Sequence, residues 1–490
     1  MNRSVSAYLG AILCIAASTS CTAQAQAPAP ALKLVQTMPL AGNITGNFDH
    51  FGVDIKRNRL FVTPEDFGSV LVLDISSGDI VHRIDGLVRP HAILYRQDTD
   101  SLYVTDGGDG SVRVFSGETY RPTARIPLLK DADSIGYDMS RHYLYIDNGG
   151  GDVGQTSSML SVVDTATNAK LSELRIQGDT LEAMALDNYR PHIYVNDKAT
   201  NEIVVVDRLK NDVIARWPVT MGHQNVAIAL DEFHQRLFVG CRSGQVVIID
   251  SNTGKELKAL PIHKGVDDLV YDPTSLRLYA STNGFVDVFE QTDLNTYASR
   301  GSVPTGTNAR TERLVPELDR LFVAVPKGAS PHARVLVFQP INTPAPRETP
   351  VDVKEPVNAP VAEQLVLEEL SQHPQLRRMG LHVIPPGQHT MILIANGNAT
   401  RLGIHTSPGD FAAVEGGKTY GPRIADGEFY NMKMPMFDAE GRSIGILVME
   451  IPCTYATSEQ DAARKAESIR AELAKKIPSL NALFSALPAT

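Results

Sequence analysis

Short apolar runs, rich in β-branched residues and separated by turn residues, follow one another through about the first two thirds of the chain. Such runs, broken by Asn, Asp and Gly, are typical of β-strands joined by tight turns. The stretch from Gly222 to Ile262 contains four of them, at Val226–Leu230, Arg236–Val239, Gln245–Ile249 and Glu256–Ile262. The pattern therefore predicts a unit of four short strands.

The same unit recurs along the chain. The second run of each unit opens with Leu or Ile followed by Phe or Tyr, and successive motifs start 41 to 49 residues apart. The motifs start at Arg59, Ser101, Tyr143, His192, Arg236, Arg277 and Arg320. The third runs repeat in step, at Val70–Asp74, Val112–Phe115, Leu160–Asp164, Ile203–Asp207, Val246–Asp250, Val286–Phe289 and Val335–Phe338. This period is that of a propeller blade, so seven motifs predict an all-β, seven-bladed β-propeller.

The two ends of the repeat region are unequal. After Phe338 the chain enters Pro-rich sequence, so the last unit lacks a fourth run, whereas Leu32–Leu40 is an extra run ahead of the first unit. We expect this N-terminal strand to pair with the last blade and close the ring, because closure removes the exposed sheet edges.

Composition shifts divide the chain into four segments. We predict a signal peptide at residues 1–25, the propeller at 26–340, a Pro-rich, semi-rigid linker at 341–360 and a small α+β domain at 361–490. The last domain is expected to contain a helix, two strands, a hairpin and a final helix capped by Ser458. The predicted ranges are Val361–Leu370, Met391–Ala395, Arg401–His405, Gly427–Asp438 with Arg442–Ile451, and a helix with apolar residues Ile469, Leu473, Ile477, Leu480 and Phe484.

The first residues resemble a secretory leader. Arg3 is followed by the apolar run Leu9–Ala17, which is too short to span a bilayer, and Ala23-Gln24-Ala25 is an A-x-A cleavage signal. We therefore expect an exported protein, periplasmic or secreted, with lipid anchoring at Cys21 as the alternative. No other stretch is apolar enough to predict a transmembrane span.

Charge and cysteine usage narrow the function. The formal net charge of −10 argues against a nucleic-acid partner, because no basic patch offsets it. Cleavage of the leader would leave Cys241 and Cys453, which fall in different predicted domains. We expect two separate thiols rather than a disulfide, although the exported environment would permit one.

Residues 32–340 resemble the YVTN/YncE-type seven-bladed β-propeller family. The resemblance rests on the repeated strand–Asp–x–x–Thr/Ser–Gly unit, as in Val72–Gly78 and Ile248–Gly254, and on phrases such as Leu102-Tyr103-Val104. It implies a fold and no particular activity, because propellers serve many functions.

The C-terminal domain resembles a PAS-like, single-cache sensor module. The matching residues are Gly380–Gly387, Arg401-Leu402-Gly403, Asp410 and Pro435–Gly445. The resemblance implies a small-ligand pocket, for which Tyr420 and Arg423 are the candidates, since Arg is the natural partner of a carboxylate ligand.

In a propeller, the loops that enter the innermost strands share one face around the central channel. These loops, with the loops between second and third strands, place His50, His91, Asp133, Glu182, His223, Asn225, Arg242, Asp268 and Arg310 on the channel-mouth face as candidate ligand-binding residues. Carboxylates and imidazoles suit a divalent metal, whose candidate ligands are Asp49, His50, His91, Asp133, His223 and Asp267. The alternative is structural: Asp and Asn cap turns, and each His pairs with a nearby carboxylate.

Three functions remain open for this face. The first is a binding or scaffold protein that holds a small molecule or protein partner. The second is a propeller hydrolase of the lactonase type, with Asp49, His91, Glu182 and Asp268 as its catalytic groups, although no nucleophile motif demands it. The third is a periplasmic metal-binding protein.

Three further features have both a functional and a structural interpretation. The Gly-rich insertion Asn148–Ser158 is either a lid or a tolerated loop. Cys241 beside Arg242 is either a reactive thiolate or a small buried residue. Met432, Met434 and Met436, with His382, His389 and His405 nearby in sequence, suggest a soft-metal site, but their strand spacing favours the core.

Overall fold

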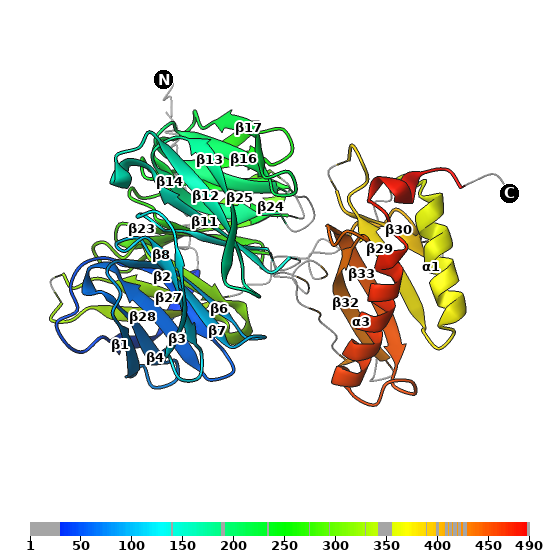
Figure 1. The fold of residues 1–490 in the computed structure, drawn as a ribbon, viewed down its shortest axis with the longest axis horizontal. Coiled ribbons are helices and arrows are strands. Elements are labelled where there is room, and N and C mark those ends of the chain that lie inside the picture. Colours follow the sequence, from blue (N-terminus) through cyan, green and yellow to red (C-terminus); the bar gives the residue numbers. More distant parts are fainter. Residues whose placement is uncertain are drawn as a thin grey trace, which may run out of the picture.

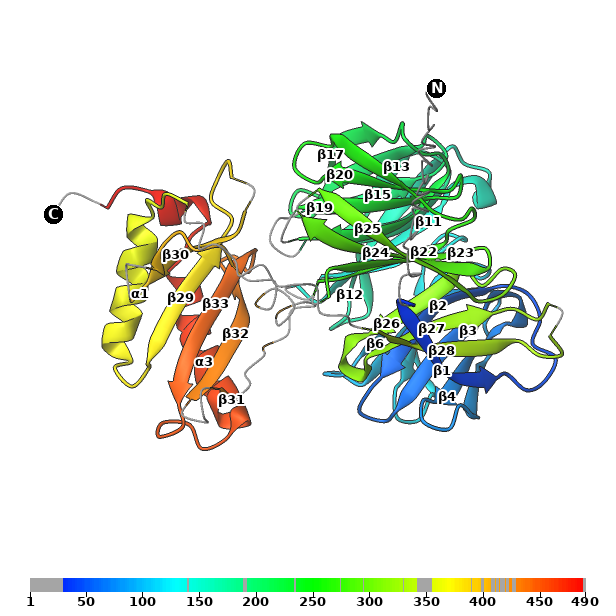
Figure 2. The same ribbon diagram turned by 180° about the vertical axis from the view of Figure 1, so that it is seen from behind.

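The computed structural model describes residues 30–341 and 355–487, apart from short gaps. The gaps are 139–140, 188–191, 233–234, 274, 294, 329, 389, 398–400, 407–409, 411–413, 415–418, 420–422 and 425–428. The predicted leader and most of the predicted linker therefore lie outside the described residues, and both remain predictions. Figures 1 and 2 show the rest as mostly β-structure.

Up to Pro340, the described residues form seven antiparallel sheets of four strands, numbered here in chain order by their first strands. Sheets 1 to 4 contain β2 (Phe48–Asp54), β3 (Arg59–Pro64), β4 (Ser69–Asp74) and β5 (Ile80–Asp85); β6 (Pro90–Arg96), β7 (Ser101–Asp106), β8 (Ser111–Ser116) and β9 (Pro122–Pro127); β10 (Ile135–Asp138), β11 (Tyr143–Gly149), β12 (Ser157–Asp164) and β13 (Ala169–Gln177); and β14 (Leu181–Leu186), β15 (His192–Asp197), β16 (Glu202–Asp207) and β17 (Asp212–Pro218).

Sheets 5 to 7 repeat the arrangement. They contain β18 (Asn225–Asp231), β19 (Arg236–Cys241), β20 (Gln245–Asp250) and β21 (Glu256–Pro261); β22 (Asp268–Asp272), β23 (Arg277–Thr282), β24 (Phe285–Asp293) and β25 (Thr296–Pro304); and β26 (Thr311–Val315), β27 (Arg320–Val325), β28 (Arg334–Pro340) and β1 (Leu32–Pro39).

The expected closing strand is confirmed. β1 pairs antiparallel with β28, and Leu32 lies opposite Pro340 while Pro39 lies opposite Arg334. The first strands β2, β6, β10, β14, β18, β22 and β26 each contact the next, and β26 contacts β2 in turn. The seven sheets thus follow one another in a closed cycle, which is the arrangement of a β-propeller.

The second and third strands of each sheet are buried on both faces, which explains why they are almost continuously apolar, whereas outer strands such as β5 are largely exposed. In β3, Leu60 packs in a cluster with Phe322 of sheet 7, whereas its neighbour Phe61 packs with Leu102 of sheet 2. Successive side chains of a strand point to opposite faces, so the Leu of each Leu–aromatic pair packs against one neighbouring sheet and the aromatic residue packs against the other.

The repeated Asp–x–x–Thr/Ser–Gly unit is a turn that the Asp side chain holds. The Asp74 carboxylate accepts hydrogen bonds of 3.0 Å from the backbone N–H groups of Ser76 and Ser77. Gly78 then adopts a φ of 80°, which a residue with a side chain rarely does. Asp250 and Gly254 repeat the turn in sheet 5, with a φ of 74° at the glycine.

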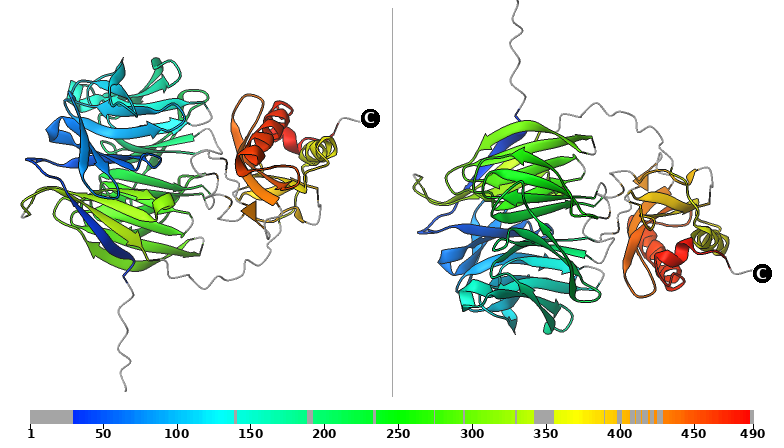
Figure 3. Two further views of the ribbon diagram at one scale, coloured as in Figure 1. Left: turned by 90° about the horizontal axis from the view of Figure 1, so that it is seen from below. Right: turned by 90° about the horizontal axis from the view of Figure 1, so that it is seen from above.

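The C-terminal residues form a separate body with one five-stranded antiparallel sheet (Figure 3). Its strand order is β30 (Ile392–Asn396), β29 (Arg378–Val383), β33 (Ser443–Pro452), β32 (Phe429–Phe437) and β31 (Arg423–Ile424). Helix α1 (Pro360–Gln372) packs on β29 and β30, and α3 (Glu459–Lys475) packs on β32 and β33, both on the same face (Figures 1 and 2). A short 3-10 helix, η7 (Asn481–Phe484), follows α3.

Most predicted C-terminal elements are present, but two differ. Residues Arg401–His405 are not a strand: they contribute only an isolated bridge from His405 to Ile392, because the chain turns at Gly403 with a φ of 81°. The final helix stops at Lys475, so Ile477, Leu480 and Phe484 lie beyond it; Pro478, which lacks the N–H that would continue the helix, was expected to disturb this end. Ser458 caps α3 as expected, accepting a hydrogen bond from the Asp461 N–H.

Across the described residues, no helix combines the length and the apolar character needed to cross a bilayer.

Candidate functional site

Strand register identifies one equivalent position at the start of each first strand. Phe51 lies opposite Val62, Ile93 opposite Val104, and Leu269 opposite Ala280, each the fourth residue of its second strand. Two residues before these positions, and before their counterparts in the other sheets, stand Asp49, His91, Asp133, Glu182, Val226, Asp267 and Arg310. Because the first strands form a ring, these residues gather at one end of it, which we call the channel-mouth face.

β-Bulges turn several of these side chains. In sheet 1 both Asp49 and His50 oppose the single residue Thr63, and in sheet 2 both His91 and Ala92 oppose Thr105. The two threonines secure the bulged backbone: Thr63 Oγ1 donates to the His50 carbonyl at 2.9 Å, and Thr105 Oγ1 accepts from the Ala92 N–H at 2.8 Å. A bulge re-aims a side chain out of the pleat, so two chemical groups per sheet reach the same place.

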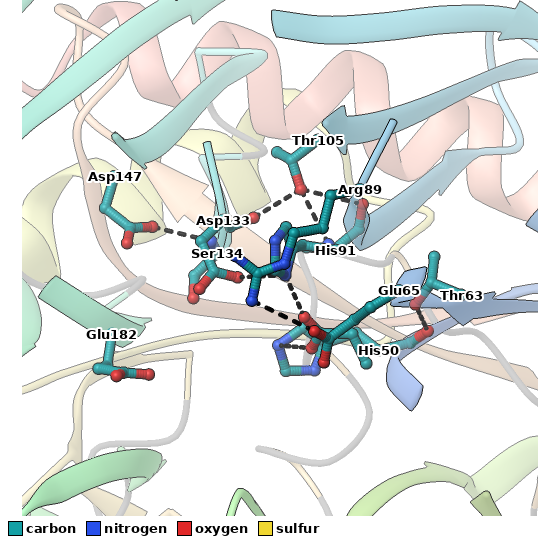
Figure 4. A network of polar contacts seen from close by, with 12 residues as sticks. His50, Thr63, Glu65, Arg89, His91, Thr105, Asp133, Ser134, Asp147 and Glu182 are labelled. Atoms are coloured by element: carbon teal, nitrogen blue, oxygen red, sulfur yellow. Dashed lines mark hydrogen bonds and ion pairs between the residues drawn. The ribbon is translucent and has the colours of Figure 1, made fainter. Parts of the chain in front are cut away.

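His91 lies at the centre of the network (Figure 4). Its Nδ1 is 2.5 Å from Asp49 Oδ2 and 3.5 Å from Asp133 Oδ1. The residue is only 4% exposed, and its Nε2 has no hydrogen-bond partner among the described residues. That nitrogen lies against Gly107, where an added Cβ would come within 2.9 Å of it. The far side of the ring is therefore closed to a ligand.

His50 connects carboxylates from two sheets that are not neighbours. Its Nε2 is 3.2 Å from Asp49 Oδ1, and its Nδ1 is 3.2 Å from Asp268 Oδ1. Asp268 belongs to sheet 6, so this contact passes over sheet 7. The Asp268 Oδ2 atom accepts a hydrogen bond of 2.8 Å from the Glu312 N–H, which links sheet 7 to the same chain of contacts.

His50, His91 and the carboxylates beside them stabilise one another's charged forms, as their pKa values show. Burial by itself would lower the pKa of His91, but Asp133 and Asp49 raise it to about 10. Burial likewise opposes charge on His50, yet Asp268 and Asp49 raise its pKa well above the ordinary value. Burial raises and His50 and His91 lower the pKa of Asp49, with a net value of about 2. At neutral pH, Asp49 is thus a carboxylate between two imidazolium ions.

The part of the face formed by sheets 1 to 3 carries more carboxyl groups than local cations can neutralise. Burial, with Asp49 and Glu182 nearby, raises the pKa of Asp133 to about 7. Burial and Asp133 raise the pKa of Asp147 well above the ordinary value, and burial raises those of Asp131 and Glu65. A positive charge placed here would be stabilised by all of them.

The other predicted residues on this face are held in separate pairs. Glu182 Oε1 accepts from Lys198 Nζ at 2.5 Å. Arg242 donates to Asp267, whose second oxygen lies 3.7 Å from Arg310 Nε. The sequence-predicted groups thus split into a connected cluster and a set of ion pairs beside it.

His223 and Asn225 do not join the cluster. His223 is exposed, with its backbone N–H donating to Ser243 Oγ at 2.9 Å. Asn225 is fully buried and donates to Asn196 Oδ1 at 2.8 Å, so it supports the fold. The two loops that carry His223 and Arg242 do lie side by side, since the Arg242 N–H donates to the Gln224 carbonyl at 3.0 Å.

Three of the six predicted metal ligands form a compact group. Asp49, His50 and Asp133 each offer one ligand atom, and these atoms all lie within 4.8 Å of one another. Their mixture of imidazole nitrogen and carboxylate oxygen suits zinc and other first-row divalent ions. A bound cation would have to replace the proton that His50 holds between its two carboxylates.

Sequence reasoning missed several contributors. Arg89 places one nitrogen 3.4 Å from Glu65 and another 3.9 Å from Asp152, and Thr105 Oγ1 donates to the Asp133 carbonyl at 2.6 Å. The sequence did contain a pattern that could have identified Thr105. The fifth residue of most second strands is polar within an otherwise apolar run, as at Thr63, Thr105, Asp147, Asn196 and Ser281.

The Gly-rich insertion is folded against this face. It contains the 3-10 helix η2 (Gly150–Val153), and the Gly151 N–H donates to the Asp179 carbonyl at 2.8 Å. A Cβ on Gly150 would come within 2.2 Å of that carbonyl oxygen, so the close approach requires glycine. Asp152 within the helix faces Arg89, and the insertion thereby borders the carboxyl-rich part of the face.

For Cys241 and for the three methionines of the C-terminal domain, the structure supports the structural interpretation rather than the functional one. Cys241 is fully buried, and burial, with Glu256, raises the pKa of its thiol to about 12, which argues against a reactive thiolate. Cys241 and Cys453 are both free thiols. Met432, Met434 and Met436 are buried in the C-terminal core, as their strand spacing predicted.

The predicted small-ligand pocket of the C-terminal domain stays a prediction. Tyr420 and His389 lie outside the described residues, and Arg423 opens the two-residue strand β31. His382 Nδ1 lies 2.9 Å from Thr406 Oγ1, and His405 Nε2 lies 3.3 Å from Glu355 Oε1, so the two histidines have separate polar partners.

No known family model matches the chain. Two curated relatives, both called uncharacterized protein YncE, come from Salmonella typhimurium (strain LT2) and Salmonella typhi. Each is 23% identical over 230 residues, which is 44% of this chain and 62% of the relative, so the chain spans less than two thirds of the relatives' length.

Solved structures resemble the fold at low sequence identity. The structure of U3-55K matches 64% of this chain and all of its own, with a TM-score of 0.54 and 12% identity. A chain of the mitotic checkpoint complex matches 69% of this chain and 99% of its own, with a TM-score of 0.52 and 13% identity. Together with the sheets, these likenesses support a β-propeller fold and leave the activity open.

Proposed function

We propose that this chain is an exported binding protein whose seven sheets are the blades of a YVTN/YncE-type propeller, and that the channel-mouth face holds its ligand. One observation carries the proposal. His50 joins Asp49 of sheet 1 to Asp268 of sheet 6, and the ligand atoms of Asp49, His50 and Asp133, from sheets 1 and 3, all lie within 4.8 Å of one another. Rigid scaffolds that converge polar groups from several loops are characteristic of binding sites.

The ligand group that fits best is a cation. Asp133, Asp147, Asp131 and Glu65 all have raised pKa values, first because of burial and then because of neighbouring carboxyl groups, so negative charge at sheets 1 to 3 carries a cost. A divalent metal ion or the ammonium group of a small molecule or protein partner would relieve it. The periplasmic metal-binding function is the specific form of this proposal that the Asp49, His50 and Asp133 group favours.

Binding is favoured over hydrolysis by the state of the two imidazoles. A general base of the lactonase type needs a ring nitrogen that can reach substrate. His91 Nε2 is enclosed against Gly107, and both ring nitrogens of His50 face carboxylates. Of the four residues of the hydrolase alternative, Asp49 and His91 form a pair, Asp268 joins them through His50, and Glu182 is paired with Lys198.

The experiment is a calorimetric titration of the purified, chelator-treated protein with Zn²⁺, Mn²⁺ and Ca²⁺ at pH 6 and pH 8. Binding at this face is expected to strengthen with pH, because the cation competes with the proton on Asp133, whose pKa is about 7. Asp133→Asn should weaken binding and remove the part of the pH dependence that Asp133 contributes, leaving the part that comes from displacing the His50 proton. Asp267→Asn, in a separate pair on the same face, is the matched control and should bind as the wild type does.

Failure of every cation to bind the wild type at this face would reject the metal form of the proposal. A screen of amine ligands with the same variants then tests the small-molecule form. The hydrolase alternative predicts turnover of lactones that the Asp49→Asn variant abolishes; turnover in the wild type would replace the binding proposal.

Export and the role of the C-terminal domain are parts of the same proposal that rest on sequence. The leader predicts that the mature protein begins near Gln26 in the periplasm or medium, which N-terminal sequencing of cell fractions tests. The PAS-like resemblance predicts that the C-terminal domain binds a small carboxylate ligand through Arg423, and a thermal-shift screen with Arg423→Ala as the comparison tests this.

A further inference from the structure

We propose a divalent metal site in the C-terminal body, between helices α1 and α3, formed by Glu369, His373 and Glu472. Their ligand atoms all lie within 4.8 Å of one another. The site is independent of the channel-mouth face and involves none of the residues of the function proposed above. Figure 1 shows the two helices side by side, and they are in contact.

The helical repeat brings the first two ligands together. Glu369 and His373 are four residues apart at the C-terminal end of α1, and positions i and i+4 share one face of a helix. His373 is the C-cap residue, whose N–H donates to the Glu369 carbonyl at 2.9 Å. Glu472 comes from the last turns of α3, so the third ligand depends on the packing of the two helices.

The distances are those of ligands around an ion rather than of hydrogen-bonded partners. His373 Nε2 lies 3.6 Å from Glu369 Oε2 and 3.7 Å from Glu472 Oε2, beyond ordinary hydrogen-bond length. Tetrahedral zinc, with bonds of about 2.0–2.2 Å, separates its ligand atoms by about 3.3–3.6 Å. Small side-chain adjustments would therefore place all three atoms on one ion.

A second observation points to the same ligand. Glu369 is fully buried, and its Oε2 and the His373 Nε2 both lack a hydrogen-bond partner among the described residues. A buried, unsatisfied carboxylate oxygen is costly, and here it is aimed at an equally unsatisfied imidazole nitrogen. One cation between them would satisfy both atoms at once.

Neighbouring residues orient the groups of the proposed metal site. Lys476 Nζ donates to Glu369 Oε1 at 2.5 Å, which orients the carboxylate and leaves Oε2 directed at His373. Such outer contacts commonly fix the direction of metal-binding groups. The Glu472 side chain is 48% exposed, so the site is open to water on that side, which would complete the coordination. An imidazole with two carboxylates favours zinc over magnesium or calcium.

The test uses the full chain carrying Asp49→Asn and His50→Gln, which removes the other candidate site. After chelator treatment, Zn²⁺ affinity is measured by competition with a chromophoric chelator. We expect one equivalent of Zn²⁺ to bind, and His373→Gln and Glu472→Gln each to weaken binding at least about 100-fold. Co²⁺ should give visible absorption that the same two variants abolish.

The matched control is Glu467→Gln on α3, whose side chain is 49% exposed and pairs with Arg470. It should leave Zn²⁺ affinity unchanged. Because Glu472 lies on the surface, its substitution tests the site even where His373→Gln fails to fold, as judged by far-UV circular dichroism. The proposal is overturned if the background protein binds no Zn²⁺, or if Glu472→Gln binds it as tightly as Glu467→Gln does; a bare Lys476–Glu369–His373 ion-pair network would give either result.

Discussion

Among the residues that the structure describes, two groups combine an imidazole with several carboxylates, and they differ in how their charges are compensated. On the channel-mouth face, His50 places both ring nitrogens 3.2 Å from carboxylate oxygens, and His91 Nδ1 is 2.5 Å from Asp49. Between α1 and α3, His373 Nε2 stands 3.6 and 3.7 Å from two carboxylate oxygens and donates no hydrogen bond to either.

The difference teaches what each cluster needs from a ligand. On the channel-mouth face, the imidazoles of His50 and His91 already hold protons against carboxylates, so a cation of the kind proposed would have to displace protons and should bind in a pH-dependent way. The α1–α3 groups hold two buried atoms without partners, so an ion completes them without breaking a good contact. Substitutions in the two clusters can therefore distinguish charge that is neutralised by neighbouring side chains from charge that would be neutralised by a bound ion.

Removing the central imidazole should have the largest effect on the first cluster. His91→Gln leaves the partly buried Asp49 with one cationic partner fewer, and breaking a buried pair costs about 3 kcal/mol of unfolding free energy. The folded-state pKa of His91 is about 10, above the unfolded value, so its contribution is complete below about pH 6.5 and is lost as pH rises through 10. The difference between variant and wild type should shrink over that window.

Urea unfolding followed by tryptophan fluorescence measures this effect, because Trp217 in β17 is the single tryptophan of the chain and reports on sheet 4. His223→Gln, an exposed imidazole on the same face, is the control and should change the unfolding free energy by less than about 0.5 kcal/mol. Equal effects of the two substitutions would show that His91 compensates no buried charge.

Asp133→Asn should have the opposite effect and increase the free energy of unfolding at high pH. The pKa of Asp133 is raised to about 7, so the folded protein holds a proton that the unfolded chain loses near pH 4, and wild-type stability falls as pH rises between these values. The variant is therefore expected to be more stable than the wild type by about 4 kcal/mol at pH 8 and equal to it near pH 4. A stability difference that does not vary with pH would contradict this.

A weaker perturbation tests whether the α1–α3 site depends on local geometry alone. Ser458→Ala removes the N-cap of α3, whose side chain accepts from the Asp461 N–H, and should destabilise the C-terminal body by about 1 kcal/mol. Far-UV circular dichroism during urea unfolding measures the loss. Zn²⁺ affinity should stay unchanged, because Glu472 is near the other end of the helix; a loss as large as that of Glu472→Gln would mean that any weakening of α3 removes the metal.

Much of the fold could be predicted from local pattern. The Leu–aromatic motif located the second strands, the Asp–x–x–Thr/Ser–Gly units located the turns, and the unpaired run Leu32–Leu40 predicted the closing pair of β1 with β28. The strand at Arg401–His405 was wrong because a glycine turn interrupts it. Pro478 was expected to disturb the end of the final helix, and the helix does end before it, at Lys475; a short 3-10 helix follows at Asn481–Phe484.

Less of the site could be predicted. Asp49, His50, His91, Asp133 and Asp268 were all candidates, but so were His223, which is exposed, and Asn225, which is buried within the sheet contacts. Position in a loop says which face a residue reaches and not which partner it meets. The α1–α3 cluster had no sequence signal beyond the spacing of Glu369 and His373, which occurs in many helices.

By itself, the sequence determined the strands, their period and the turns, because each depends on interactions within a few residues of chain. The tertiary structure alone decided that His50 reaches Asp268 over a neighbouring sheet, that Gly107 closes off His91 Nε2, and that Glu472 meets His373 across two helices. These contacts depend on bulges, ring closure and helix packing, which bring together residues more than 40 positions apart in most cases. Charge compensation follows from those distances, so it could be known only once the chain was folded.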